Sequence, residues 1–326
     1  MELDIRQFGK GAIQTPEHIA AGKFVIKQEP LRAINWSVPY TIEQGFTLTQ
    51  RDQDGSSSCT GQATVYYVEA LNKIENNKDE RYSARFNYSQ SYAPGGGAYI
   101  WKAMSIPLNQ GVASLESVPE GNSTEAEMID QSLNNQAKIE AKADKYAQIP
   151  LQRNVDWLAQ VLEDYHGFET GFNGRNDMFS PDGTANLLNG PAEWGHAVFV
   201  VGREIRNGKR CFKFKNSWSS YWGSNGYGYF PEEFITQGPI FDAYVYALVE
   251  DIDPNSMTQA LTDVQLNNLW LAVFKRPIDA GGLAFYRGKS YDTVMQDVLG
   301  SKENKYYGDV FKATKAMEDA IRTGQF

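Results

Sequence analysis

The segment from Gly195 to Phe230 constrains the fold of this chain more than any other. Its first part, HAVFVVG, is apolar on both faces, which is typical of a buried strand. A later part, CFKFKNSW, alternates apolar and polar residues, as a half-exposed strand does. Between them lies Asn207-Gly208, a dipeptide that strongly favours a tight hairpin. The segment therefore predicts an antiparallel hairpin whose first strand is buried.

Helical periodicity marks three other segments. TGQATVYYVEALNKI and NVDWLAQVLEDYHG carry apolar residues on one helical face, and both predict amphipathic helices. The glycines of APGGGAYI break the chain, and the apolar-rich residues from there to about Leu108 predict a third helix. Residues 120–150 are rich in Asn, Glu, Lys and Ala, so we expect a solvated segment. The predicted helices of this part of the chain therefore precede its strand-rich part.

Composition excludes several classes of protein. A chain of 326 residues with 41% hydrophobic and 22% charged residues is ordinary for a globular protein and long enough for two domains. Its net charge of -9 argues against a nucleic-acid partner. There is no apolar run of the roughly 20 residues that a membrane helix needs. The start, MELDIRQFGK, lacks the apolar core of a signal peptide, and two cysteines suit a reducing compartment.

The pattern changes along the chain suggest four parts. Residues 1–32 carry weak periodicity and form an N-terminal arm, and residues 33–252 hold the main domain. Residues 253–260 are polar with a proline and suggest a linker. Residues 261–326 predict a small all-α module, because Thr262 and Gln265 make a capping-box pattern. One apolar helical face follows the cap and comprises Leu266, Leu269, Trp270, Val273 and Phe274.

Cys59 stands at the predicted start of the first helix, behind the polar run RDQDGSSS. Unpaired N–H groups and the helix dipole there favour an anion, so we expect a lowered thiol pKa. A thiolate nucleophile needs a proton acceptor and donor, usually histidine. His196 opens the buried strand and is the candidate. His18, in the arm, and His166, at a helix end, are interpreted as surface or local structural residues.

A catalytic imidazole is typically oriented by a third group. The hairpin folds the KNSW run back towards His196. Strand alternation places Asn216 on the same face as Phe212 and Phe214, and Cys211 on the opposite face. Asn216 is therefore the candidate orienting residue, and Cys211 is interpreted as a structural cysteine.

These motifs together resemble the papain-like cysteine peptidases, in the short prokaryotic or phage style. The matching stretches are GFTLTQRDQDGSSSC, GHAVFVVG and KNSWSSYWGSNGYGYF, which occur in family order over about residues 33–250. The resemblance implies an α+β fold, with a helical subdomain, an antiparallel sheet or barrel subdomain, and a cleft between them. It implies no cofactor and no metal, and a protein or peptide as substrate.

The resemblance also implies roles for single residues. Cys59 would be the nucleophile, His196 the general base and acid, and Asn216 the orienting group. Gln53 and the backbone N–H of Cys59 would form the oxyanion hole. Gly96 or Gly97 would pair with the substrate backbone. Trp218 would shield the His–Asn hydrogen bond, and Trp222 would line the leaving-group side of the site.

Three residues depart from the family pattern. Ser56 stands where the family has a disulfide cysteine, Ser57 where it has a glycine near the oxyanion hole, and Thr60 where it has a tryptophan. The arm 1–32 is too short to be the long helical propeptide of secreted relatives, although it could lie across the cleft.

The tail has a weaker resemblance. LWLAVFKRPIDAGGLAFYRG is similar to a short helical module of unknown function in bacterial surface and phage proteins, with an Arg-x-x-Asp-x-x-Gly core. That likeness suggests a virion or cell-surface partner for the C-terminal module. The lack of a signal-peptide pattern predicts a cytoplasmic or virion-associated protein. Asp279 could suggest a metal, but a capped turn between helices is the favoured interpretation.

Three functions remain open from the sequence. The first is a cysteine peptidase acting through an acyl-enzyme. The second is a thiol amidase or transpeptidase acting on cell-wall peptides. The third is an inactive papain-fold component of a virion or an adhesion structure, which the changes at Ser57 and Thr60 would suit. The joint presence of Gln53, Cys59 and the His–Asn pair favours the first.

Overall fold

The computed structural model describes residues 11–14, 31–149, 154–238 and 240–251, and in the last part of the chain residues 263, 266, 267, 270, 274, 276–289, 293, 294, 297 and 298. The chain divides into two compact units, Met1–Ile252 and Asp253–Phe326. The helices of the first unit are α1 (Cys59–Asn76), α2 (Ala84–Ser91), α3 (Ile100–Asn109), α4 (Glu125–Ile129), the 3₁₀ turn η2 (Asn134–Gln136), α5 (Val155–Asp164) and α6 (Glu232–Gln237). Its strands are β1 (Ala12–Ile13), β2 (Tyr40–Thr41), β3 (Ala98–Tyr99), β4 (Val112–Ala113), β5 (Ile139–Gln148), β6 (Phe168–Gly174), β7 (Trp194–Arg206), β8 (Lys209–Lys215), β9 (Tyr227–Pro231) and β10 (Ile240–Asp251).

One antiparallel sheet organises the first unit. Its strand order is β4-β5-β10-β6-β7-β8-β9, and β2 pairs with β7. The β7–β8 hairpin turns at Asn207 and Gly208, which adopt φ of 50° and 76°. Both values lie in the left-handed region that the tightest hairpin turns require. The predicted hairpin is confirmed, and β7 is buried from His196 to Gly202.

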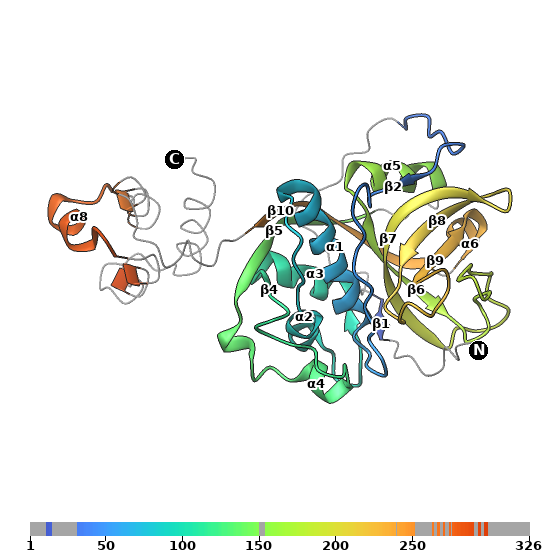
Figure 1. Cartoon of the computed structure of the whole chain (residues 1–326), viewed down its shortest axis with the longest axis horizontal. Coiled ribbons are helices and arrows are strands. Elements are labelled where there is room, and N and C mark those ends of the chain that lie inside the picture. Colours follow the sequence, from blue (N-terminus) through green and yellow to red (C-terminus); the bar gives the residue numbers. More distant parts are fainter. Residues whose placement is uncertain are drawn as a thin grey trace. The chain divides into compact units, whose positions relative to one another are not determined.

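Helices and sheet separate into two parts that meet at α1. Helices α1 to α4 lie beside β5 and β10 and form the helical part. Strands β6 to β9, together with α5 and α6, form the sheet part (Figure 1). Helix α1 packs against β7 and β10, so it lies at the boundary between the two parts. This arrangement confirms the α+β, papain-like architecture that the sequence predicts.

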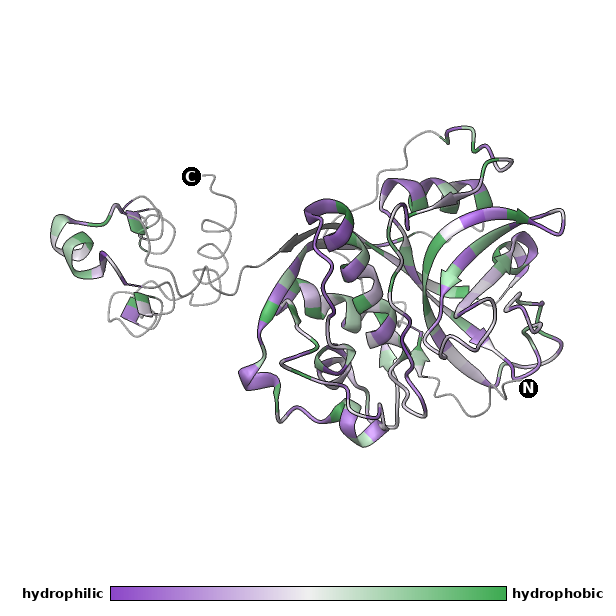
Figure 2. Cartoon of the chain, viewed as in Figure 1, coloured by the Kyte–Doolittle hydropathy of each residue, from purple (hydrophilic) through white to green (hydrophobic). Residues whose placement is uncertain are grey.

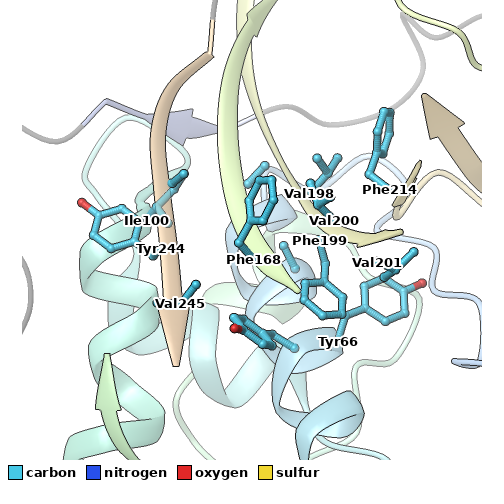
Figure 3. Close-up of a cluster of buried hydrophobic side chains, with 14 of the residues drawn as sticks. Tyr66, Ile100, Phe168, Val198, Phe199, Val200, Val201, Phe214, Tyr244 and Val245 are labelled. Atoms are coloured by element: carbon cyan, nitrogen blue, oxygen red, sulfur yellow. The ribbon is translucent and has the colours of Figure 1, made fainter. Parts of the chain in front are cut away.

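The core joins the two parts. Tyr66 from α1, Ile100 from α3 and strand residues such as Phe168 and Phe199 fill the interior (Figure 3). Hydrophobic residues run along β7, while the outer surface of the helical part carries hydrophilic residues (Figure 2). The three predicted helices are confirmed as α1, α3 and α5, and Asn154 caps α5 by accepting from the N–H of Asp156 and of Trp157.

Residues 120–150 differ from the sequence expectation. This segment is not merely solvated, because β5 pairs with β10 inside the sheet. Ala141, Ala143 and Ala147 are buried, while Glu140 and Lys142 are partly exposed. Alanine is a weak apolar signal, so the alternation of a genuine strand was hidden among charged residues.

The second unit is described for fewer residues. Leu266, Trp270 and Phe274 are helical and buried, whereas Thr262, Gln265, Leu269 and Val273 of the predicted cap and face lie outside the described residues. Helix α8 (Ala280–Tyr286) begins after Asp279, whose side chain accepts from the N–H of Gly282 at 2.7 Å. Asp279 is therefore the N-cap residue of α8, which agrees with the favoured interpretation of a capping role. In the described parts of the chain, no helix is long and apolar enough to cross a membrane.

Candidate active site

Cys59 is the first residue of α1 and is completely buried. The preceding residue, Ser58, makes no side-chain cap, so the first N–H groups of the helix are not used by it. The backbone N–H groups of Ala197, Gly11 and Thr60 lie close enough to the Cys59 thiol to lower its pKa. Ala197 follows His196 on β7, and α1 packs against that strand.

His196 is held by two neighbours from the segment after β8. Its Nε2 lies 2.8 Å from Oδ1 of Asn216, and both side chains are buried. The indole of Trp218 stacks on the imidazole, with ring centroids 4.3 Å apart and planes 29° apart. Asn216 Oδ1 also accepts from the N–H of Ser217 at 2.8 Å, which fixes the amide. The predicted orienting residue and shielding ring therefore both contact the imidazole.

Gln53 lies in the loop before Cys59, and hydrogen bonds fix its side chain. Its Nε2 donates to the carbonyl of Ser56 at 2.8 Å, and its Oε1 accepts from the Ser217 hydroxyl at 2.6 Å. Its backbone N–H donates to the carbonyl of Ser217 at 2.9 Å. These bonds connect the loop before Cys59 to the segment after Asn216. The side chain is fully buried, so Gln53 also contributes to folding, which the sequence did not indicate.

Gly11, the first described residue of the arm, packs against the loop that carries Cys59 and against the glycine loop. Strand β1 pairs in parallel with β3, and the N–H of Ala98 donates to the carbonyl of Gly11 at 2.8 Å. A Cβ on Gly11 would lie 2.4 Å from the carbonyl oxygen of Ser57 and 2.7 Å from the Cα of Gly97. Gly11 therefore fills a gap too narrow for any side chain, and it buries the thiol.

The thiol pKa differs in direction from the sequence expectation. Burial raises the pKa of Cys59 to about 11, and the buried carboxyl of Glu169 adds to this. The N–H donors from Ala197, Gly11 and Thr60 lower it, as the helix terminus predicted, but by less. Desolvation outweighs the helix terminus because the arm excludes water from the sulfur.

The predicted substrate-binding glycines and second tryptophan lie close by. Gly97 adopts a φ of 78°, and a Cβ there would lie 1.9 Å from the Gly11 carbonyl oxygen. Gly96 faces Ser57, with an added Cβ 3.7 Å from its hydroxyl. Trp222 packs edge-to-face on Trp218 at 5.2 Å and is almost fully buried.

The three departures from the family pattern fit without disturbing the triad. Ser56 donates to the carbonyl of Gln53 at 2.7 Å and lies 2.8 Å from the hydroxyl of Ser58. Ser57 uses its backbone N–H to bind Glu125, and Thr60 is buried in the first turn of α1. Ser56 and Ser57 therefore stabilise the cysteine loop through hydrogen bonds, whereas the Thr60 hydroxyl is buried without a partner among the described residues.

The remaining cysteine and histidines lie elsewhere. Cys211 is buried on β8 opposite Glu204 and Pro231 and is free, as is Cys59. His166 adopts a φ of 51° in the turn after α5, and burial lowers its pKa. His18 lies outside the described residues. No group of three or more metal-binding side chains occurs among the residues that the structure describes.

Sequence reasoning missed three contributors to this site: Gly11, Tyr88 and Glu125. The sequence allows the arm to lie across the cleft, but no pattern in it singles out Gly11. Tyr88 lies on α2, and Glu125 follows Thr124, whose capping box with Glu127 is visible in the letters STEAE. That pattern indicates a helix start but not what its first carboxylate contacts.

Comparisons with known proteins agree with this geometry. Residues 37–246 match the papain family of cysteine proteases. The chain is 25% identical over 222 residues to a cysteine protease of Blomia tropicalis, covering 64% of this chain and 65% of that protein. It is also 25% identical over 210 residues to a KDEL-tailed cysteine endopeptidase of Arabidopsis thaliana, covering 63% of this chain and 56% of that protein. The match thus spans less than two thirds of the length of either relative.

A solved structure shows the same fold. The cysteine protease xylellain from Xylella fastidiosa superposes with a TM-score of 0.61 at 21% identity, covering 75% of this chain and 97% of that one. The family match extends over more than half of the chain and includes Cys59, His196 and Asn216. The chain belongs to the papain family of cysteine proteases.

Proposed function

We propose that the protein is a cysteine peptidase that hydrolyses peptide bonds through Cys59, His196 and Asn216. The observation that carries the proposal is the buried His196–Asn216 hydrogen bond under Trp218, beside a thiol at a helix N-terminus. An imidazole oriented by an amide and placed next to a thiol is the arrangement that nucleophilic catalysis needs.

The proposed reaction has two stages. The Cys59 proton moves to Nδ1 of His196, because Nε2 is occupied by Asn216. The thiolate then bonds to the substrate carbonyl carbon, and the oxyanion is held by Gln53 Nε2 and the Cys59 N–H. Collapse breaks the C–N bond, and His196 gives its proton to the leaving amine. Water then attacks the thioester, gives a proton to His196 and releases the acid, which restores the thiolate.

The arm supports a closed form of this proposed enzyme. The Gly11 N–H lies near the sulfur, while the Gly11 carbonyl accepts from the N–H of Ala98. Gly11 therefore occupies the space between the cysteine loop and the glycine loop. We infer that β1 must leave before a substrate can bind.

The other candidate functions have less support. A thiol amidase or transpeptidase would use the same triad, and cleavage of cell-wall fragments but not of protein would favour it. An inactive scaffold would not need Gln53, His196 and Asn216 fixed as they are. For the second unit we propose binding at a virion or cell surface, and a virion-associated or cytoplasmic location. Both rest on its likeness to the small helical module, and sedimentation of the full chain with bacterial envelopes would test them.

The test is labelling with an epoxide probe for cysteine peptidases, combined with hydrolysis of a casein substrate. Peptide mass spectrometry would locate the adduct in the parent and in His196→Ala and Asn216→Ala. We expect one adduct on Cys59 in the parent, and a loss of labelling and hydrolysis in both variants. Hydrolysis retained by His196→Ala would remove the proposed mechanism.

A further inference from the structure

A carboxylate from α4 joins the two loops on either side of the arm. Oε2 of Glu125 accepts from the backbone N–H of Ser57 at 2.6 Å, on the loop that carries Cys59. Oε1 accepts from the hydroxyl of Tyr88 at 2.8 Å. The same hydroxyl accepts from the N–H of Gly97 at 3.0 Å, on the glycine loop. One continuous chain of hydrogen bonds therefore runs from the cysteine loop to the glycine loop.

Glu125 is not needed to cap its own helix. Thr124 and Glu127 form the capping box of α4, in which the Thr124 side chain accepts from the Glu127 N–H. Met128 anchors the same helix in the interior, and Asp130 at its end pairs with Arg85 at 2.6 Å. The helix is thus held by other contacts, and the Glu125 carboxylate points away from it towards Ser57 and Tyr88.

The Tyr88 hydroxyl is a suitable donor for this series of hydrogen bonds. Tyr88 is fully buried, and burial together with the Glu125 carboxylate raises the pKa of its phenol strongly. The phenol therefore stays protonated, and its O–H donates a hydrogen bond to Glu125. Hydrogen bonds to an ionised carboxylate are roughly twice as strong as those between neutral groups.

Spacing between the two loops is critical at this point. The added Cβ on Gly11 would approach both Ser57 and Gly97 more closely than real side chains do. The two loops leave room for Gly11 and for no larger residue, so a change in their spacing would change what fits between them. No disulfide can set this spacing, because both cysteines of the chain are free and Ser56 bonds within its own loop.

We propose that Glu125, acting through Tyr88, is a positioning residue that fixes the cysteine loop relative to the glycine loop. The proposal rests on the peptidase function for its catalytic consequence, but the bracing itself does not depend on it. The chain uses a polar brace of Ser57, Glu125, Tyr88 and Gly97, which a reducing agent cannot open.

The experiment compares Glu125→Gln with Glu127→Gln in the full-length protein. The control removes the same charge half a turn away, and glutamine keeps a capping box. Hydrogen exchange at Ser57 and Gly97 is measured together with kcat and KM for peptide hydrolysis. In Glu125→Gln we expect faster exchange at both amides and a fall of about tenfold to hundredfold in kcat, with little change in KM, since small misplacements reduce rate. Glu127→Gln should match the parent in all three.

Tyr88→Phe provides an independent check. It should reproduce the effect, and the double variant should be no worse than either single one, because both changes break the same chain of bonds. Equal exchange in the two glutamine variants would overturn the brace. A protein that hydrolyses no peptide even when β1 is displaced, as in Gly11→Leu, would defeat the proposed function, while the exchange data would still decide the brace.

Discussion

The two cysteines show that equal burial can have different origins. Cys59 and Cys211 are both almost inaccessible, and burial raises the pKa of each thiol to about 11. Around Cys211 the cover is the sheet itself, with Glu204 and Glu233 nearby adding negative charge. Around Cys59 part of the cover is Gly11, the residue just before the two-residue strand β1 of the N-terminal arm. A permanent cover makes a structural thiol, whereas a removable one makes a latent nucleophile.

The largest difference should appear when each sulfur is removed. Cys59→Ala should abolish peptide hydrolysis, because it removes the nucleophile. Cys211→Ala should keep the parent rate and cost about 1–2 kcal/mol of stability from lost packing. Hydrolysis assays with urea unfolding check both. A Cys211→Ala protein that folds but has lost its activity would end the contrast.

Gln53→Ala should separate chemistry at Cys59 from simple thiol reactivity. Loss of one oxyanion donor costs about 10²–10³ in kcat, whereas alkylation by iodoacetamide forms no oxyanion and should change little. The variant should also lose about 1–3 kcal/mol of stability, because it leaves the Ser217 hydroxyl unpaired. Kinetics and alkylation rates measured on one preparation decide it, and equal losses in both would show general damage.

Gly11→Leu tests whether the cover of Cys59 is removable. The gap beside Ser57 and Gly97 has no room for a side chain, so β1 should be displaced. Return of the thiol pKa from about 11 to its ordinary 9.0 raises the thiolate fraction, and hence Cys59 alkylation near neutral pH, about hundredfold. Cys211 should keep its rate.

The matched control for that substitution is Gln14→Leu, which adds bulk at an exposed position of the same arm. It should leave both cysteines unchanged. If Gly11→Leu labels Cys211 as much as Cys59, the protein has unfolded instead of opening.

Glu169 should affect peptide hydrolysis least, and its expected effect is on the pH dependence of stability. It is buried beneath α1, where Thr64 donates to its Oε2 at 2.8 Å, and burial raises its pKa well above 4.5. A folded-state pKa above the unfolded value gives stability that is complete below about pH 4.5 and is lost as pH rises towards the folded value. The loss is about 1.4 kcal/mol per pH unit. Glu169→Gln should flatten this slope between pH 5 and 8.

Urea unfolding at pH 5 and pH 8 measures that slope. The control is Glu204→Gln. Glu204 lies on β7 opposite Cys211 of β8, and its substitution should keep the pH slope of the parent. Glu169→Gln should also lower the thiol pKa of Cys59, whose value the Glu169 carboxyl raises, and leave that of Cys211 unchanged. An unchanged slope in Glu169→Gln would mean that this carboxyl is not the buried acid that matters.

The sequence predicted the elements that local patterns encode. The Asn207-Gly208 hairpin and α1 follow from turn chemistry and helical period. The meeting of His196 and Asn216 follows from the hairpin that joins them. By contrast, the contact of Gly11 with Ser57 and of Glu125 with Tyr88 joins segments far apart in the chain, and no periodicity records such contacts.

The parallel pairing of β1 with β3 has a consequence for how the protein would be controlled. The arm belongs to the same chain as Cys59, so its local concentration at the site is fixed and does not fall on dilution. Tethered segments reach effective concentrations in the millimolar range. A few hydrogen bonds from Gly11 and its neighbours can therefore keep a weak ligand bound. A substrate must therefore bind well enough to compete with the effective concentration of the arm, or the arm must first be cleaved or displaced.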